Sequence, residues 1–265
     1  AAEAMNFTQS GVSHLIKTIE DEFGFPVLIR GKGGVRLTEN GRALLPAIRE
    51  ILNANDHMDQ IVANIRGMSF GRLRIGTFAS ASVLWLPKII EEFSHDYPGI
   101  QIEIIVGGND SLISQLDESC IDFAIMSNPP QGYEWIHLAS DRMLVLLPPG
   151  HRLVDKDRVT LDEIDDDPFI LSNEGFDYDV SQIIKGSGIT PRLSFSTMEN
   201  RGIIAMIQHG LGVTVMPEMV LDSLESNVIT KELAPCEYRH MGIIVKSVHT
   251  ASLAAKTFIS YAKRI

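Results

Sequence analysis

A heptad stripe in the first quarter of the chain is the feature that most restricts its fold. Side chains at spacings of 4, 3, 4, 3, 4 and 3 residues form it, namely Leu44, Ile48, Ile51, Asn55, Met58, Val62 and Ile65. This repeat predicts one long helix that pairs with a partner helix, with Asn55 as a polar residue that fixes the register. Thr38 can cap this helix, which we expect over residues 39–66 as a dimerising linker. The alternative is that the stripe packs on its own domain.

The residues before this helix predict a shorter helix and a β-hairpin. Thr8-Gln9-Ser10 can cap a helix with one apolar face, made of Val12, Leu15, Ile16, Ile19 and Phe23. Its other face carries short polar groups and a cation, which suit contacts with bases and phosphates, although an ordinary solvent-exposed face has the same composition. Gly24 ends the helix, and residues 27–30 and 35–38 predict two strands around the turn Gly31-Lys32-Gly33-Gly34. A helix followed by a hairpin with a cationic tip is typical of a winged DNA-binding domain.

These residues resemble the LysR-type family of transcriptional regulators. Thr8 to Lys17 is similar to that family's S-Q-P-A-V-S-x-x-I-x motif, Ile19 to Gly24 is similar to L-E-x-E-L-G, and Arg30 and Leu37 to Gly41 continue the match. The chain departs from the family at Ser10 and Gly11, where Pro and Ala are usual, and at His14, where a cation is frequent. Glycine inside a helix costs on the order of 1 kcal/mol relative to alanine, so this helix is expected to order fully only when it binds DNA.

The resemblance implies a winged helix-turn-helix over residues 1–38 whose first helix precedes Ala1, so that Ala1 to Asn6 form the last turns of a helix. Without that helix, these 265 residues are expected to bind DNA poorly. It also implies that the partner is double-stranded DNA with a pseudo-palindromic promoter site. The linker helix is expected to form a homodimer, and two dimers are expected to form a homotetramer. RNA polymerase is a further candidate partner. The predicted DNA contacts are Thr8, Gln9, Ser10, Ser13, His14, Lys17, Arg30, Lys32 and Arg36.

After a hinge at residues 67–71, strands and helices alternate. Strands are predicted at 73–76, 100–106 and 121–126, and the helices predicted at 82–96 and 110–118 lie between them. This alternation predicts an open parallel sheet covered by helices. Residues 142–148 are predicted to cross to a second lobe, and residues 241–246 to return. We therefore expect a two-lobed α/β domain like periplasmic binding proteins, with lobe I at 72–143 and 247–265 and lobe II at 144–246.

Ligands in such sheets bind at the carboxyl ends of strands, next to the N-termini of the following helices. The residues at these positions are also where the resemblance places effectors, although each hydroxyl could simply cap a helix. The predicted effector-binding residues are Thr77, Phe78, Ala79, Ser80, Ser82, Asn109, Asp110, Ser127, Asn128, Asp177, Tyr178, Met198 and Glu199. They include three carboxylates and, apart from Arg201 nearby, no Lys or Arg. This favours a ligand with an amino group, such as an amino acid or an amine.

The net charge of −11 would argue against nucleic acid, but the acidity lies in the larger part of the chain. Residues 1–66 carry 7 Lys and Arg against 8 Asp and Glu, whereas residues 67–265 carry 16 against 26. No apolar run is long enough to span a membrane and no signal peptide is visible, so we expect a cytoplasmic protein.

Other functional classes find less support in the sequence. Cys120 and Cys236 are far apart and lack ligand spacing, so we expect inert thiols, no metal and no cofactor. No GxSxG, HExxH or P-loop pattern suggests an enzyme. The main alternative is a transport solute-binding protein, which has no use for residues 1–66.

Overall fold

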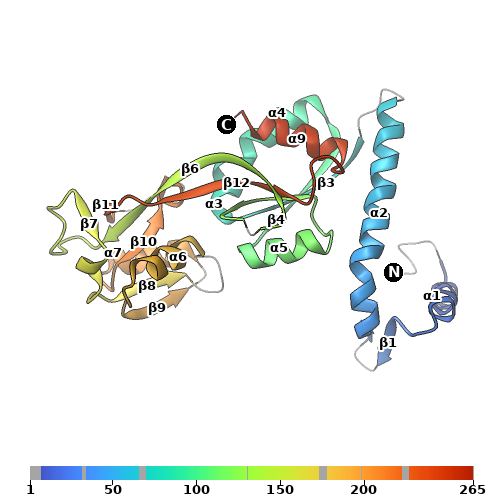
Figure 1. Ribbon diagram of the computed structural model, residues 1–265, viewed down its shortest axis with the longest axis horizontal. Helices are drawn as coiled ribbons and strands as arrows, with labels where there is room; N and C mark the ends of the chain where they lie inside the picture. The colour runs from blue at the N-terminus through green and yellow to red at the C-terminus, as the bar shows by residue number, and fades with distance from the viewer. Residues whose placement is uncertain are drawn as a thin grey trace. The chain divides into compact units, whose positions relative to one another are not determined.

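The computed structural model describes residues 7–31, 34–65, 70–129, 131–172, 178–197, 199–222 and 227–264 (Figure 1). The chain divides into two compact units, one up to Asn55 and one from Asp56 onward. The prediction for residues 1–6, and the part of the predicted hinge at residues 67–69, lie outside the described residues.

In the first unit, a helix and a hairpin precede the long helix. Helix α1 spans Gln9–Phe23, strands β1 and β2 span Leu28–Gly31 and Gly34–Leu37, and helix α2 begins at Glu39. The side chain of Thr8 accepts a hydrogen bond from the N–H of Gly11, and Gly24 ends α1 in the left-handed conformation at a φ of 75°. The predicted caps are therefore confirmed.

Helix α2 spans Glu39–Ile65, where a linker helix was predicted. Thr38 caps its start, since its Oγ1 accepts from the N–H of Gly41 at 2.9 Å. Pro46 lies inside the first turns and leaves one backbone hydrogen bond unmade there. Of the heptad stripe, Ile48, Ile51, Met58 and Val62 are between 40 and 70% exposed. The apolar stripe is therefore not covered by the described part of its own chain.

The second unit is built on one mixed eight-stranded sheet. Its order is β4-β3-β5-β12-β6-β11-β7, with β10 also paired to β6. The strands are β3 (Phe70–Thr77), β4 (Gly99–Val106), β5 (Phe123–Ser127), β6 (Glu134–Leu147), β7 (Arg158–Thr160), β10 (Thr214–Pro217), β11 (Ile229–Ala234) and β12 (Tyr238–Val245). Strand β3 runs parallel to β4 and β5, as predicted, but β12 is antiparallel to both β5 and β6. The prediction of a wholly parallel sheet is therefore wrong.

A small parallel sheet and seven α-helices complete the described part of this unit. The sheet pairs β8 (Phe169–Ser172) with β9 (Leu193–Thr197). The helices are α3 (Ala79–Leu84), α4 (Leu86–Asp96), α5 (Asn109–Asp117), α6 (Tyr178–Ser187), α7 (Asn200–Gln208), α8 (Glu218–Asp222) and α9 (Leu253–Ala262), and a 3-10 turn spans Asp162–Ile164. The single helix predicted over residues 82–96 is two helices, broken at Trp85. Pro87 explains the break, because it has no N–H and favours the first turn of a new helix.

The unit has two lobes, which share strand β6. We call the first lobe the part packed around Phe93, Phe123, Phe258 and Ile244, and the second lobe the part packed around Val145, Phe169 and Ile204. The first half of β6 pairs with β12, and the second half pairs with β10 and β11. Figure 1 shows β6 and β12 running side by side between the lobes. The predicted boundary after residue 246 is wrong for β12, because Ile243 and Val245 lie in the core of the first lobe.

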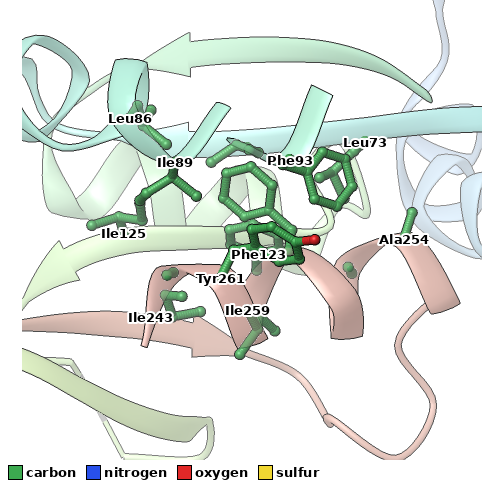
Figure 2. Packing of buried hydrophobic residues seen from close by; sticks show 14 of the residues in the cluster. Leu73, Leu86, Ile89, Phe93, Phe123, Ile125, Ile243, Ala254, Ile259 and Tyr261 are labelled. Carbon is green, nitrogen blue, oxygen red and sulfur yellow. The ribbon is translucent and has the colours of Figure 1, made fainter. Parts of the chain in front are cut away.

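Aromatic rings fill the centre of the first lobe. The ring of Phe93 lies 5.2 Å from that of Phe258 and 5.6 Å from that of Tyr261, both edge-on, and Phe123 lies 5.7 Å from Phe258. Figure 2 shows Phe93, Phe123 and Tyr261 meeting between Leu73 and Ile259. This packing joins α4, β5 and α9 and gives the site residues of the first lobe a rigid support.

Candidate DNA-binding and effector sites

The predicted recognition face of α1 is accessible. Gln9, Ser10, His14 and Lys17 are exposed and Ser13 is half-buried, all on one short helix. The hydroxyl of Thr8 is engaged with the N–H of Gly11 at 3.1 Å and with Ser10 Oγ at 3.1 Å. Thr8 therefore orders the start of the helix, and the polar groups that follow it are presented to solvent.

The hairpin is fixed to α1 by Glu20, which the sequence analysis did not single out. Its Oε1 accepts from the backbone N–H of Val27 at 2.7 Å and of Leu28 at 3.0 Å. These two bonds lower the pKa of Glu20 below its usual value, with a smaller contribution from Arg30. Arg30 and Arg36 are exposed on β1 and β2. Lys32 lies outside the described residues.

Glycine permits the hairpin to approach the start of α2. A Cβ on Gly41 would lie 2.2 Å from the carbonyl oxygen of Val27. Thr38 closes the same corner, because its Oγ1 donates to the carbonyl of Pro26 at 2.9 Å and its N–H to that of Val27 at 3.0 Å. Helix α1, the hairpin and the start of α2 are thus held together by a few hydrogen bonds to the backbone of residues 26–28 and by the close approach of Gly41 to Val27.

In the first lobe, most predicted effector residues lie at strand ends, as expected. Thr77, Ser80, Asn109 and Ser127 are buried. The amide of Asn109 donates to the carbonyl of Ser127 at 2.9 Å, which holds two strand ends together. The hydroxyl of Ser82, by contrast, donates to the carbonyl of Ala79 within its own helix at 2.7 Å, and Asp110 is exposed. Ser82 therefore bonds within its own helix, and this bond is neither an effector contact nor the helix cap that was the alternative for each hydroxyl.

A carboxylate of the second lobe contacts the first lobe directly. Asp179, in the first turn of α6, accepts from Ser127 Oγ at 2.8 Å and from Asn128 Nδ2 at 2.7 Å. Asn128 has a positive φ of 44°, which asparagine tolerates better than most residues and which is uncommon enough to indicate a constrained position. Burial raises the pKa of the Asp179 carboxyl, although these hydrogen bonds and Arg239 oppose the shift. The charge of Asp179 is therefore only partly compensated by its neighbours.

A buried ion pair lies beside this contact. Arg239 Nη2 donates to Asp141 Oδ2 at 2.6 Å and to Ser80 Oγ at 3.4 Å, and its guanidinium lies 4.8 Å from the centre of the Phe78 ring. Asp141 also accepts from the N–H of Met219 at 3.1 Å. The expectation that no Lys or Arg other than Arg201 lies near the effector residues is therefore wrong. We call Phe78, Ser80, Ser127, Asn128, Asp141, Asp179 and Arg239 the interlobe cluster.

One donor of the interlobe cluster is left unused. Among the described residues, no group accepts a hydrogen bond from Arg239 Nε, although this atom is buried. A buried donor without a partner costs about 1–3 kcal/mol, and more when it is charged. An acceptor brought by a ligand or by water would remove this cost.

The remaining predicted effector residues that the structure describes are not part of the interlobe cluster. Tyr178 begins α6, next to Asp179. Glu199 is exposed and caps α7, since its carboxylate accepts from the N–H of Arg201 at 3.3 Å. Ala79 is exposed at the start of α3. Asp177 and Met198 lie outside the described residues.

The described residues hold no group of three or more His, Cys, Asp or Glu side chains placed to bind a metal ion. Both cysteines are free thiols. No helix within the described ranges has the length and apolarity needed to cross a membrane.

Comparisons with known proteins match both parts of the chain to one family. Residues 1–42 match the model of the bacterial regulatory helix-turn-helix protein of the lysR family, and residues 66–264 match the LysR substrate binding domain. The chain is 35% identical to the uncharacterized HTH-type transcriptional regulator YvbU of Bacillus subtilis over 268 residues, which cover 100% of this chain and 92% of that one.

Solved structures share the fold. A full-length OxyR variant of Pseudomonas aeruginosa matches with a TM-score of 0.76 and 21% identity over 99% of this chain and 90% of that one. The regulatory domain of Synechocystis CcmR, solved in complex with 2-PG, matches with a TM-score of 0.67 and 20% identity over 73% of this chain and 96% of that domain. Because the two family models together match residues 1–42 and 66–264, the chain belongs to the LysR family of transcriptional regulators.

Proposed function

We propose that this regulator binds pseudo-palindromic promoter DNA in the cytoplasm and that a small molecule held at the interlobe cluster alters this binding. Recognition helices of a dimer would enter successive major grooves, with Gln9, Ser10, Ser13, His14 and Lys17 at base edges and phosphates and with Arg30, Lys32 and Arg36 on the backbone. The exposed stripe of α2 supports a dimer through this helix, and we propose that dimers pair into a tetramer. RNA polymerase is a further partner in this proposal.

The observation that carries the effector proposal is the contact of Asp179 with Ser127 and Asn128. This contact joins the lobes through the Asp179 carboxylate, whose charge is only partly compensated by its neighbours. A ligand that binds next to Asp179 would therefore change the balance between two arrangements of the lobes. Such a bias would alter the geometry of the DNA-binding units in a dimer or tetramer.

An amino acid suits the chemistry of the interlobe cluster. Its ammonium group would donate to Asp179, and its carboxylate would accept from the buried Nε of Arg239. The sequence favoured an amino group because the predicted effector residues include no Lys or Arg, but Arg239 lies in the interlobe cluster. Its positive charge is nevertheless paired with Asp141, so a dicarboxylate would find one unused donor beside two carboxylates. The proposal therefore rests on Asp179 and Arg239 together.

Calorimetric titration of the full chain with the standard amino acids, simple amines and dicarboxylates tests this proposal. We expect one or a few amino acids to bind, and Ser80→Ala to weaken that binding because Ser80 helps to hold Arg239. Exposed Ser260 outside the cluster provides a matched control, since Ser260→Ala should bind as the unchanged chain does. Tighter binding of amine-free diacids than of every amino acid would contradict the proposed ligand class.

A further inference from the structure

A cavity of about 540 Å³ lies on the side of α6 that faces the loop between β11 and β12. Its walls come from four segments, namely α6, the end of β7 with the 3-10 turn, the β11–β12 connection and Asn128 of the first lobe. A volume of this size is within the range of small-molecule sites, roughly 300–1,000 Å³. Of the predicted effector residues that the structure describes, only Asn128 lines it, so the cavity meets the first-lobe strand ends at this one residue.

The cavity combines an apolar floor with an acidic wall. Leu161, Ile183 and Leu233 form apolar walls and belong to one core cluster of the second lobe, so they are held rigidly. Three carboxylates line the same space, from Asp162, Asp179 and Glu237. None of the described lining residues is Lys, Arg or His. The negative charge is therefore not balanced within the cavity.

Two of these carboxylates are available to a ligand. In the described part of the chain, the carboxylates of Asp162 and Glu237 make no hydrogen bond and no ion pair. Asp179 is bonded to Ser127 and Asn128, yet burial still raises its pKa, so a nearby positive charge would stabilise its ionised form. The lining also offers Thr160, Ser187 and Tyr238 hydroxyls as further hydrogen-bonding groups.

From this geometry we propose that the cavity is a second ligand site, which takes an organic cation with an aliphatic body, such as an alkyl amine or diamine. The ammonium groups bind the carboxylates of Asp162, Asp179 and Glu237, and the methylene groups pack on Leu161, Ile183 and Leu233. The described lining does not form a group of three side chains that could hold a metal ion.

The site is also placed to influence the interlobe contact, and this consequence rests on the proposed function. A cation beside Asp179 stabilises the same carboxylate that accepts from Ser127 and Asn128. In the proposed function the ammonium group of the interlobe ligand binds this same carboxylate, so the two ligands compete for Asp179. In the regulator, binding in the cavity therefore weakens binding of the interlobe ligand, and each ligand lowers the affinity for the other by the same factor.

Calorimetric titration of the full chain with 1,4-diaminobutane tests the site. The neutral isostere 1,4-butanediol, the dianion succinate and CaCl₂ are the comparison probes. We expect the diamine alone to bind, and the double variant Asp162→Asn with Glu237→Gln to lose at least about tenfold in affinity, since each change removes a charge-assisted hydrogen bond. Glu91→Gln is the matched control, because Glu91 is an exposed acid of α4 in the first lobe, outside the cavity and outside the predicted effector residues.

The outcomes separate this inference from the proposed function. Equal binding of the diol or of Ca²⁺, no diamine binding by the folded chain, or unchanged affinity in the double variant overturns the cavity site. Diamine binding that is lost in Ser80→Ala but kept in the double variant overturns it as well, while leaving the interlobe cluster as the ligand site. Diamine binding that follows the cavity variants supports the site even where amino acids fail to bind the cluster.

Discussion

The two units of this protein differ in how they bury their apolar side chains. In the second unit, whole clusters around Phe93, Val145 and Leu146 are withdrawn from solvent. In the described residues of the first unit, Gly41 alone is buried, and Leu15, Ile19 and Phe23 of α1 are each close to half exposed. The second unit is thus stabilised by its own core, whereas the contacts among the described residues of the first unit are mainly helix caps and hydrogen bonds to the backbone.

This difference matches the division of roles. A self-supporting domain can change the spacing of its lobes while keeping each core intact, which effector binding requires. In the described part of the first unit, the polar face of α1 and the apolar stripe of α2 are exposed, as contacts with DNA and with a partner helix require. The following predictions either break or refine this contrast.

Truncation of a core ring should have the largest effect. Phe258 is fully buried against Phe93 and Phe123, so Phe258→Ala should lower the free energy of unfolding of the second unit by about 3–5 kcal/mol. Leu15→Ala, at a side chain that is 45% exposed, should cost the first unit about 1 kcal/mol. Both losses can be measured by urea unfolding that is monitored by hydrogen exchange separately in each unit. Equal losses would show that the apolar face of α1 is covered in solution and would break the contrast.

A glycine-to-alanine change in each unit should lower the stability of that unit alone. A Cβ on Gly41 would lie 2.2 Å from the carbonyl oxygen of Val27, and a Cβ on Gly212 would lie 2.2 Å from that of Pro168. Each alanine variant should cost about 1–3 kcal/mol, confined to its own unit. Regional hydrogen exchange is the measurement. Gly186→Ala, with no atom near its Cβ, is the control and should be neutral or slightly stabilising.

A contact on the DNA backbone should respond to salt and not to sequence. Removing the exposed Arg36 should weaken binding to all DNA and lower the slope of log affinity against log salt by about 1. Gln9→Ala should instead reduce binding to the preferred site by about 1–3 kcal/mol and leave nonspecific binding in place. Fluorescence anisotropy across salt concentrations measures both, with Arg201→Ala of the second unit as the control. An unchanged slope in Arg36→Ala would remove the wing from the interface.

The smallest effect concerns the pH response of Glu20. Its pKa is lowered by the N–H groups of Leu28 and Val27, so its stabilising contribution is present above the ordinary value of about 4.3 and is lost as the pH falls through the lowered pKa. The amide resonances of Val27 and Leu28 should follow this titration in an NMR experiment. Glu20→Gln should abolish it and Glu22→Gln, at an exposed neighbour, should not. A midpoint at or above the ordinary value would contradict the clamp.

Local sequence signals predicted the first unit well. The heptad spacing, Thr8, Thr38 and Gly24 act over one or two helical turns, so the helices and their caps can be read from neighbouring residues. Strands β7 and β11 were not predicted. Each is short, and they pair across more than 70 residues, Glu232 opposite Arg158, so no local period marks them.

The candidate site was predicted only in part for the same reason. Ser80, Asn109, Ser127 and Asn128 follow strands, and strand ends are where ligands bind in such sheets. Asp179 and Arg239 acquire their roles from contacts with Ser127 and Asp141, 52 and 98 residues away in the sequence. Those contacts depend on how the lobes pack, which the sequence pattern does not specify.

Genome-wide footprinting with the full-length protein tests the central claim most directly. It is carried out with and without a ligand that calorimetry has first shown to bind. The account predicts protected pseudo-palindromic promoter sites, with half-sites about one helical turn or a multiple of it apart, and a change in the extent of protection when the ligand is added. Protection without sequence preference, or a footprint that is identical with saturating ligand bound, would contradict it.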